Sequence, residues 1–164
     1  MSDCCSVKDC PVSPPVAACP MNGTRSKQVD RLTVASLVRQ LPLEMPRTQY
    51  YFCETRDCDI VYFAFDSRAP IFRRGDLLIR VGAKEESDPI PVCYCFGFTR
   101  KDIEDEIAET GRPTVADRIS AEVTAGRCAC EVKNPSGKCC LGNVTRVIQD
   151  RLRNRSVGAT KVAT

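Results

Sequence analysis

The sequence predicts an α+β fold in which a small β-containing domain comes first and a helical domain follows. Two runs of aromatic and β-branched residues, YYFC at 50–53 and IVYFAF at 60–65, have the composition of strands. After residue 91 the apolar residues recur at the spacing of helices instead. Each domain of a 164-residue chain would be small, so we expect both to need stabilisation beyond an apolar core.

The boundary between the two domains is predicted in the charged stretch AKEESDPIP, which ends in two prolines. A second boundary is expected after the first cysteines, because four prolines in the first 20 residues oppose regular structure. The chain then divides into a Cys/Pro-rich N-terminal segment at 1–18, a β-containing domain at 19–90, a helical domain at 91–155 and a disordered tail at 156–164.

Within the first domain we expect one helix and three strands. The helix is predicted from a cap at Thr33 to a stop at Pro42. The two aromatic runs form the first two strands, joined by the turn at 54–59, and a third strand is predicted over Leu77 to Val81.

The helical domain is predicted from capping signals. Thr99, with Asp102 three residues later, resembles a capping box, and Gly111 ends the helix that it opens. Thr114 with Asp117 repeats this signature for a second helix, and a third helix follows Gly142. The first two form a helix-turn-helix-like arrangement.

Twelve cysteines and no histidine restrict the chemistry. The first 20 residues do not resemble a signal peptide, and no run reaches the roughly 18 apolar residues of a membrane span. We therefore expect a cytoplasmic protein without membrane insertion, in which thiols stay reduced and dense cysteines indicate metal. The lack of histidine excludes His-activated nucleophiles and Rieske clusters. The net charge of +3 is too small to indicate a nucleic-acid partner.

Three cysteine groups in the helical domain have the layout of an iron–sulfur site. Cys93 and Cys95 precede the first helix of this domain, and two later pairs, at 128/130 and 139/140, precede the last one. A [2Fe–2S] cluster needs four thiolates that converge from short loops, and N–H groups at helix starts stabilise their negative charge. Cys93 and Cys95 are therefore predicted to be cluster ligands.

The segments VCYCFGFT and CACEVKNPSGKCCLGNV also resemble known proteins. The first, with the helices after it, is similar to bacterioferritin-associated ferredoxin and related [2Fe–2S] domains. Both, together with YYFC and VYF, resemble the N-terminal domain of CopZ-type copper chaperones over roughly residues 15 to 153. This resemblance implies two metal centres, a [2Fe–2S] cluster and a mononuclear zinc. Because Cys140 lies nearest the last helix, as in the smaller ferredoxins, we predict Cys130 and Cys140 as the other cluster ligands, with Cys128 and Cys139 as alternatives.

The zinc would stabilise the β-containing domain. Cys53 and Cys58 lie across a predicted hairpin turn, as in one arm of a zinc knuckle, and zinc requires four ligands. Cys19 begins CPMNG, which has the form of a C-P-x-C-G knuckle with Asn22 in place of the second cysteine. Cys19, Cys53 and Cys58 are therefore predicted zinc ligands. For the fourth we favour Cys10, and the alternatives are Cys5, Cys4, Asp57 and Asp59.

These features predict a non-enzymatic protein that acts in electron transfer or in redox-linked handling of copper or another soft metal. Its partner would be a redox protein, a metal chaperone or a metal transporter. The sequence has no M-x-C-x-x-C loop, which favours a redox role over copper delivery. The alternative is a redox- or metal-sensing DNA-binding regulator whose phosphate-binding face consists of Arg146, Arg151, Arg153 and Arg155.

Overall fold

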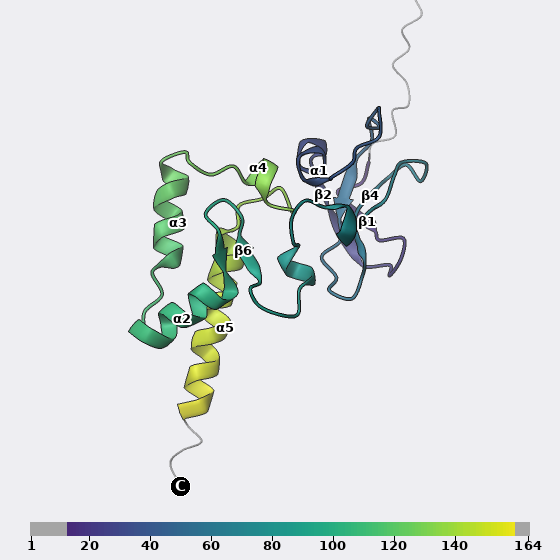
Figure 1. Ribbon diagram of the computed structural model, residues 1–164. Coiled ribbons are helices and arrows are strands. Elements are labelled where there is room, and N and C mark those ends of the chain that lie inside the picture. Colours follow the sequence, from purple (N-terminus) through teal and green to yellow (C-terminus); the bar gives the residue numbers. More distant parts are fainter. Residues whose placement is uncertain (1–12, 160–164) are drawn as a thin grey trace, which may run out of the picture.

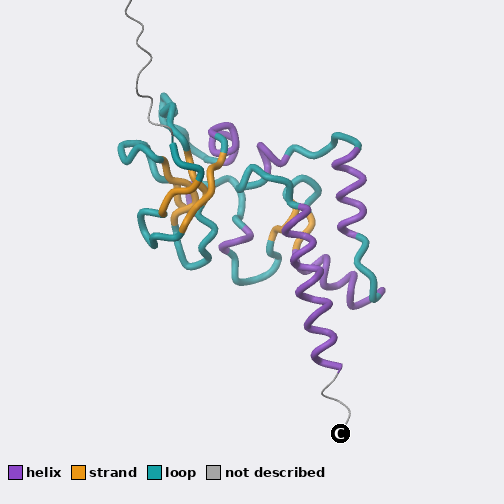
Figure 2. Tube along the Cα trace, turned by 180° about the vertical axis from the view of Figure 1, so that it is seen from behind, coloured by secondary structure: helices purple, strands orange, loops and turns teal. Residues whose placement is uncertain are grey.

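The computed structural model describes the backbone of residues 13–159 and the side chains of residues 13–155. Cys4, Cys5 and Cys10 lie outside the described residues. The chain folds into two halves that lie side by side, a β-sheet with one helix and a group of helices (Figure 1). The view from behind shows most strands in one half and the long helices in the other (Figure 2). In the described part, no helix is long and apolar enough to cross a membrane.

The first half is a five-stranded antiparallel sheet in which neighbours in the sequence are neighbours in space. Its strands are β1 (Val16–Ala18), β2 (Arg25–Val29), β3 (Tyr50–Phe52), β4 (Ile60–Ala64) and β5 (Phe72–Arg73). The strands expected from the two aromatic runs are therefore confirmed as β3 and β4. The expectation of no regular structure before residue 19 is wrong for β1, because the turn after it lets Val16 pair with Lys27 of β2.

Two other predictions in this half are corrected. The helix α1 (Arg31–Leu37) begins three residues earlier than expected, because Asp30 and not Thr33 is its N-cap and accepts a hydrogen bond from the Leu32 N–H at 2.7 Å. Leu77 to Val81 is not a strand. Leu77 makes one isolated β-bridge with Val38, the residue after α1, so the backbone of this segment pairs outside the sheet.

The second half begins with a hairpin of β6 (Pro91–Cys93) and β7 (Phe98–Thr99), followed by four helices. They are α2 (Arg100–Thr110), α3 (Val115–Thr124), the short α4 (Cys130–Lys133) and α5 (Leu141–Ala159). The capping box of Thr99 and Asp102 is confirmed, and Gly111 ends α2 at a φ of 72°. At α3 the predicted signature is wrong, because the Thr114 side chain does not cap the helix. The last helix continues to Ala159, beyond residue 155.

Each half has its own apolar core. The sheet and α1 enclose a core that includes Val34, Tyr50, Val61 and Tyr62, all fully buried. In the other half, α2, α3 and α5 pack together through Ile103, Ile107, Val115, Ile119, Val144 and Ile148. Cysteines lie within this second core as well, which places part of the predicted cluster site against buried apolar side chains.

The two halves are joined where α1 packs against α4. The Thr33 hydroxyl donates a hydrogen bond to the Glu131 carbonyl at 2.6 Å, and the Tyr62 hydroxyl donates one to the Pro135 carbonyl at 2.7 Å. The loop that connects the later cysteine pairs is therefore held by the sheet domain.

Candidate metal centres

The three predicted zinc ligands of the described chain come together at one end of the sheet. The Sγ atoms of Cys19, Cys53 and Cys58 all lie within 4.8 Å of one another, and those of Cys19 and Cys58 are 3.8 Å apart. All three side chains are at most 2% exposed. They pack against Tyr51, Ile60 and Phe63, so a metal bound here would be shielded from water on one side.

Two tight loops place these thiols. Cys19 directly follows β1, and its backbone closes the turn to β2 through hydrogen bonds with Gly23 and Thr24. Gly23 has a φ of 69°, a conformation that glycine adopts without strain. Cys53 and Cys58 lie on either side of the turn between β3 and β4, where the Cys58 N–H donates to the Thr55 carbonyl at 3.2 Å. Two hairpin turns of one sheet thus converge, as in a zinc knuckle.

A buried lysine lies beneath the second loop. Lys84 is 0% exposed, and its ammonium donates to the carbonyls of Thr55 at 2.8 Å and Cys58 at 2.9 Å. Burial lowers the pKa of Lys84, while the nearby cysteines raise it. Lys84 therefore holds the turn and places a positive charge beside the three thiols.

The thiols differ in acidity. Burial raises the pKa of Cys53, but hydrogen bonds from Thr55 and the charge of Lys84 outweigh it and lower that pKa overall. Burial and the adjacent cysteines raise the pKa of Cys58 to about 11. Anionic sulfur is thus favoured at Cys53, and a cation bound among the three would favour it at the others.

The four predicted cluster ligands meet in two pairs. Cys93 and Cys140 have their Sγ atoms 2.8 Å apart, and those of Cys95 and Cys130 are 3.4 Å apart. Cys93 ends β6, Cys130 opens α4, and Cys140 directly precedes α5, where its carbonyl accepts from the Val144 N–H. The β6–β7 hairpin and the starts of two helices therefore bring the predicted residues together.

Backbone N–H groups surround this site. The Ala129 N–H donates to Cys95 Sγ at 3.3 Å. The Cys140 thiol and the N–H groups of Phe96 and Cys95 lower the pKa of Cys93 to about 6, against the effect of burial. The hydrogen bond with Cys93 raises the pKa of Cys140, and burial raises that of Cys130 to about 12. The surroundings therefore favour an anionic sulfur at Cys93 alone among these three cysteines. The thiols of Cys130 and Cys140 need a bound cation to become thiolates.

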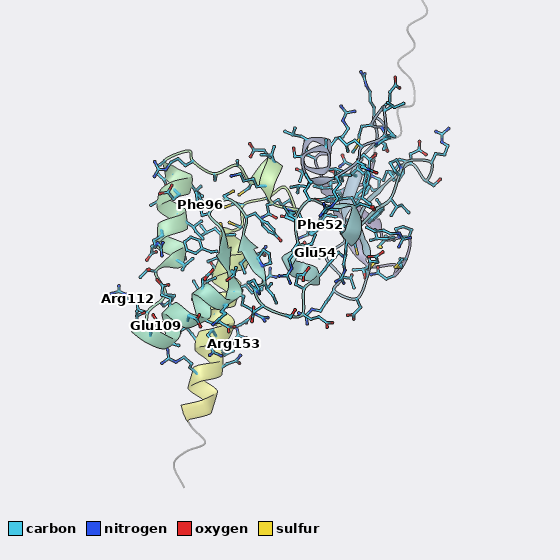
Figure 3. All side chains as sticks on the ribbon, viewed as in Figure 1. Phe52, Glu54, Phe96, Glu109, Arg112 and Arg153 are labelled. Atoms are coloured by element: carbon cyan, nitrogen blue, oxygen red, sulfur yellow. The ribbon has the colours of Figure 1, made fainter. Side chains whose placement is uncertain are left out.

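The two alternative cluster residues occupy more open positions. Cys128 is partly buried, and Cys139 is exposed. Cys139 lines a cavity of about 440 Å³, to which Phe52 and Glu54 contribute from the sheet domain. Figure 3 shows Phe52 and Glu54 between the two halves. Neither alternative residue forms a close sulfur pair among those described above.

Sequence reasoning missed two residues at the first centre. Met21 Sδ lies 3.7 Å from Cys58 Sγ. In the segment CPMNG, the sequence pattern had pointed only to Cys19 and Asn22. Lys84 comes from the segment that was interpreted as a boundary, and a lysine in a charged stretch gives no sign of burial. The spacing of Met21 from Cys19 could have indicated the first, whereas only tertiary structure reveals the second.

Comparison with known proteins places this geometry in a family context. Residues 16–78 match a family model of the CopZ type that is described as a zinc binding domain. The crystal structure of the *Archaeoglobus fulgidus* CopZ N-terminal domain aligns with a TM-score of 0.63 and 32% identity, covering 79% of this chain and 95% of that one. The chain contains a CopZ-like N-terminal domain.

The copper chaperone CopZ of *Archaeoglobus fulgidus* is also similar in sequence. It is 35% identical over 131 residues, which are 79% of this chain and 60% of the relative. The chain therefore spans about 60% of the length of this CopZ relative. The family model and the group of three cysteines together support a zinc or other metal ion in the sheet domain.

Proposed function

We propose that this CopZ-like protein binds a zinc ion and a [2Fe–2S] cluster and acts in electron transfer or in redox-linked handling of copper or another soft metal. Cys19, Cys53 and Cys58 would hold the zinc, and Cys93, Cys95, Cys130 and Cys140 the cluster. The partner would be a redox protein, a metal chaperone or a transporter. A role as a carrier rather than an enzyme agrees with the similarity to a copper chaperone.

The arrangement of the sulfurs supports two different kinds of centre. A mononuclear ion needs all its ligands around one point, and the three thiols of the sheet domain are grouped in this way. Among the described residues, the other six cysteines form no such group of three, and four of them meet as two pairs. Two pairs suit a [2Fe–2S] cluster, in which each iron takes two thiolates. This pairing is the observation that carries the proposal.

The residues around the pairs fit a cluster of this kind. Buried apolar side chains from α2, α3 and α5 would limit access of water, and N–H groups near the sulfurs would balance negative charge. A bound cluster would supply one-electron redox chemistry. The chain itself positions the thiolates and excludes solvent.

The experiment is anaerobic purification followed by visible and EPR spectra together with iron, sulfide and zinc analysis. The Cys130→Ser and Cys140→Ser variants should lose cluster content, because each removes one partner of a sulfur pair. Cys128→Ser and Cys139→Ser are the matched controls and should retain it. The reverse pattern would refute the choice of ligands, and an iron-free wild-type protein would refute the cluster.

The DNA-binding alternative is not favoured by the comparisons. Two of its arginines also have contacts within the protein. Arg155 donates to the Ile107 carbonyl at 2.7 Å, and Arg153 pairs with Asp150 at 3.6 Å.

A further inference from the structure

The zinc-type centre of the sheet domain has three cysteines, and a tetrahedral site needs a fourth donor. The described residues offer no carboxylate for this place. The group of ligand atoms within 4.8 Å contains only Cys19, Cys53 and Cys58. Asp59, one of the alternatives, pairs instead with Arg73 at 3.1 Å, and Asp57 is exposed.

Asn22, at the position of the missing knuckle cysteine, is engaged in other contacts. Its Oδ1 accepts a hydrogen bond from the Thr24 N–H at 2.9 Å, which stabilises the turn. Its Nδ2 faces Cys53 Sγ at 3.8 Å as a donor. An amide that donates to a ligand sulfur supports that ligand from outside the coordination sphere. Asn22 therefore does not provide the fourth donor.

Met21 has the required position. Two sulfur ligands at about 2.3 Å from one tetrahedral ion lie roughly 3.8 Å apart. Cys19 and Cys58 are separated by 3.8 Å, and the thioether sulfur of Met21 is 3.7 Å from Cys58 Sγ. Both separations are close to the edge expected for such a tetrahedron, and they share the Cys58 sulfur.

The exposure of Met21 adds a second argument. Its side chain is 50% exposed, whereas the three cysteines are almost fully buried. A large exposed apolar side chain could turn away from a polar site without losing buried contacts. The Met21 side chain nevertheless lies against the Cys58 thiol. Met21 is thus a partly exposed residue whose thioether contacts one of the buried thiols.

We propose that Met21 is the fourth ligand of this centre, which makes it a three-thiolate, one-thioether site that takes Cu(I) as well as zinc. This inference rests on the metal-binding role of Cys19, Cys53 and Cys58 proposed above. Thiolate and thioether are soft donors, and together they suit monovalent copper. No redox step is involved, because the ion binds as Cu(I).

The test measures Cu(I) affinity by competition with a chromogenic chelator under anaerobic conditions. It uses the full chain with its metal centres, after zinc has been removed from the sheet domain by competition. Met21→Leu should lower the affinity about tenfold or more, the scale reached even by residues that only support a ligand. Met45→Leu is the matched control, because Met45 packs beside the core of the sheet domain. Cys58→Ser gives the baseline for copper bound elsewhere.

Two further variants decide between donors. Cys10→Ser should leave the Cu(I) affinity unchanged. If Cys10→Ser instead loses Cu(I) affinity while Met21→Leu keeps it, the proposal is overturned. Asn22→Cys restores a fourth thiolate, so Met21→Leu should have little effect in that background. The cobalt-substituted protein gives an independent readout, because loss of a sulfur donor changes its visible spectrum.

The outcomes separate the two proposals. If wild type and Cys58→Ser bind zinc and Cu(I) equally, no metal centre exists at these cysteines, and both proposals fail for this site. If wild type binds zinc at these cysteines but Met21→Leu matches wild type for Cu(I), only the assignment of Met21 fails.

Discussion

Single residues outside the ligand sets determine how the cysteines are presented, and Lys84 is the clearest case. Its ammonium is buried without a carboxylate partner among its hydrogen bonds and instead binds the carbonyls of Thr55 and Cys58. A buried cation is costly unless it is compensated. Three cysteines that become thiolates around a metal provide that compensation, so the lysine and the centre stabilise each other.

Replacement of Lys84 should therefore affect both folding and metal binding. Lys84→Met keeps the apolar stem but removes the lysine donor to the buried Cys58 carbonyl, at a cost of about 1–3 kcal/mol, whereas the Thr55 carbonyl still accepts from the Cys58 N–H. Zinc affinity should fall roughly tenfold, as for other residues that support ligands. Urea unfolding and zinc competition measure the two effects. The exposed Lys133 provides the control Lys133→Met, and equal behaviour of both variants would contradict this role.

At the scale of elements, a carboxylate of α2 binds the start of α3. Glu106 of α2 accepts hydrogen bonds from the N–H groups of Thr114 at 2.9 Å and Val115 at 3.3 Å, and from the Thr114 hydroxyl at 2.5 Å. It therefore performs the capping that the sequence had assigned to Thr114 and Asp117. One helix caps the next, which fixes the helix-turn-helix-like arrangement whose apolar core includes Cys93 and Cys140.

Glu106→Gln should destabilise the protein by about 0.5–2 kcal/mol at pH 7, the usual range for a helix cap. Burial raises the pKa of Glu106, but the hydrogen bonds from Thr114 and Val115 lower it overall. Because the folded pKa is depressed, the stabilisation is present above the unfolded value of about 4.3 and is lost as the pH falls through the folded pKa. The difference between wild type and variant should therefore shrink in acid.

Urea unfolding at pH 7 and at successively lower pH measures this difference. Glu109→Gln is the control on the same helix, at the outer end of α2 (Figure 3), and should change stability little at any pH. A constant difference across the acidic range would contradict the capping role of Glu106.

The elements that the sequence predicted correctly are those with local signals. The aromatic runs of β3 and β4 and the box of Thr99 and Asp102 need no distant partner to be recognised. The prediction of a strand over Leu77 to Val81 was wrong because the run has the composition of a strand, while in the structure only its first and last residues are buried and Leu77 pairs with Val38 behind α1. β1 escaped prediction because its pairing depends on a turn among prolines and cysteines.

For the candidate sites, the sequence identified which cysteines could act but not what surrounds them. The spacing of Cys93 and Cys95 was enough to suggest both as ligands. The later pairs left a choice among four cysteines, of which Cys130 and Cys140 are the two whose sulfurs lie close to Cys95 and Cys93. Lys84 and Met21 could not be deduced from composition, because burial of a lysine and approach of a thioether are tertiary properties. These residues decide the charge and softness of the first centre.

At the scale of the whole molecule, one loop links the sheet domain to the proposed cluster site. The loop 134–137 connects Cys130 with Cys140 and packs on the sheet domain through Tyr62 and Thr33. Within the loop, Asn134 is buried, and its amide donates to the Lys138 carbonyl. Loss of zinc would loosen the surface on which this loop rests, so zinc removal should also affect the cluster.

Gly137 is the position at which this link can be tested. Its φ is 66°, and a Cβ added there would lie 2.8 Å from the Thr33 hydroxyl oxygen. Gly137→Ala therefore combines a left-handed conformation, at roughly 1–2 kcal/mol, with a clash at the junction of the halves. Gly111→Ala is the matched control, because Gly111 has a similar φ and open space around its Cβ position.

We expect Gly137→Ala to reduce stability more in urea unfolding and to lower the iron content, whereas Gly111→Ala should keep the iron. Thr33→Ala in the Gly137→Ala background should recover part of the loss, since it removes the clashing hydroxyl. Equal stability and iron content in the two glycine variants would show that the sheet domain does not hold the cluster loop in place.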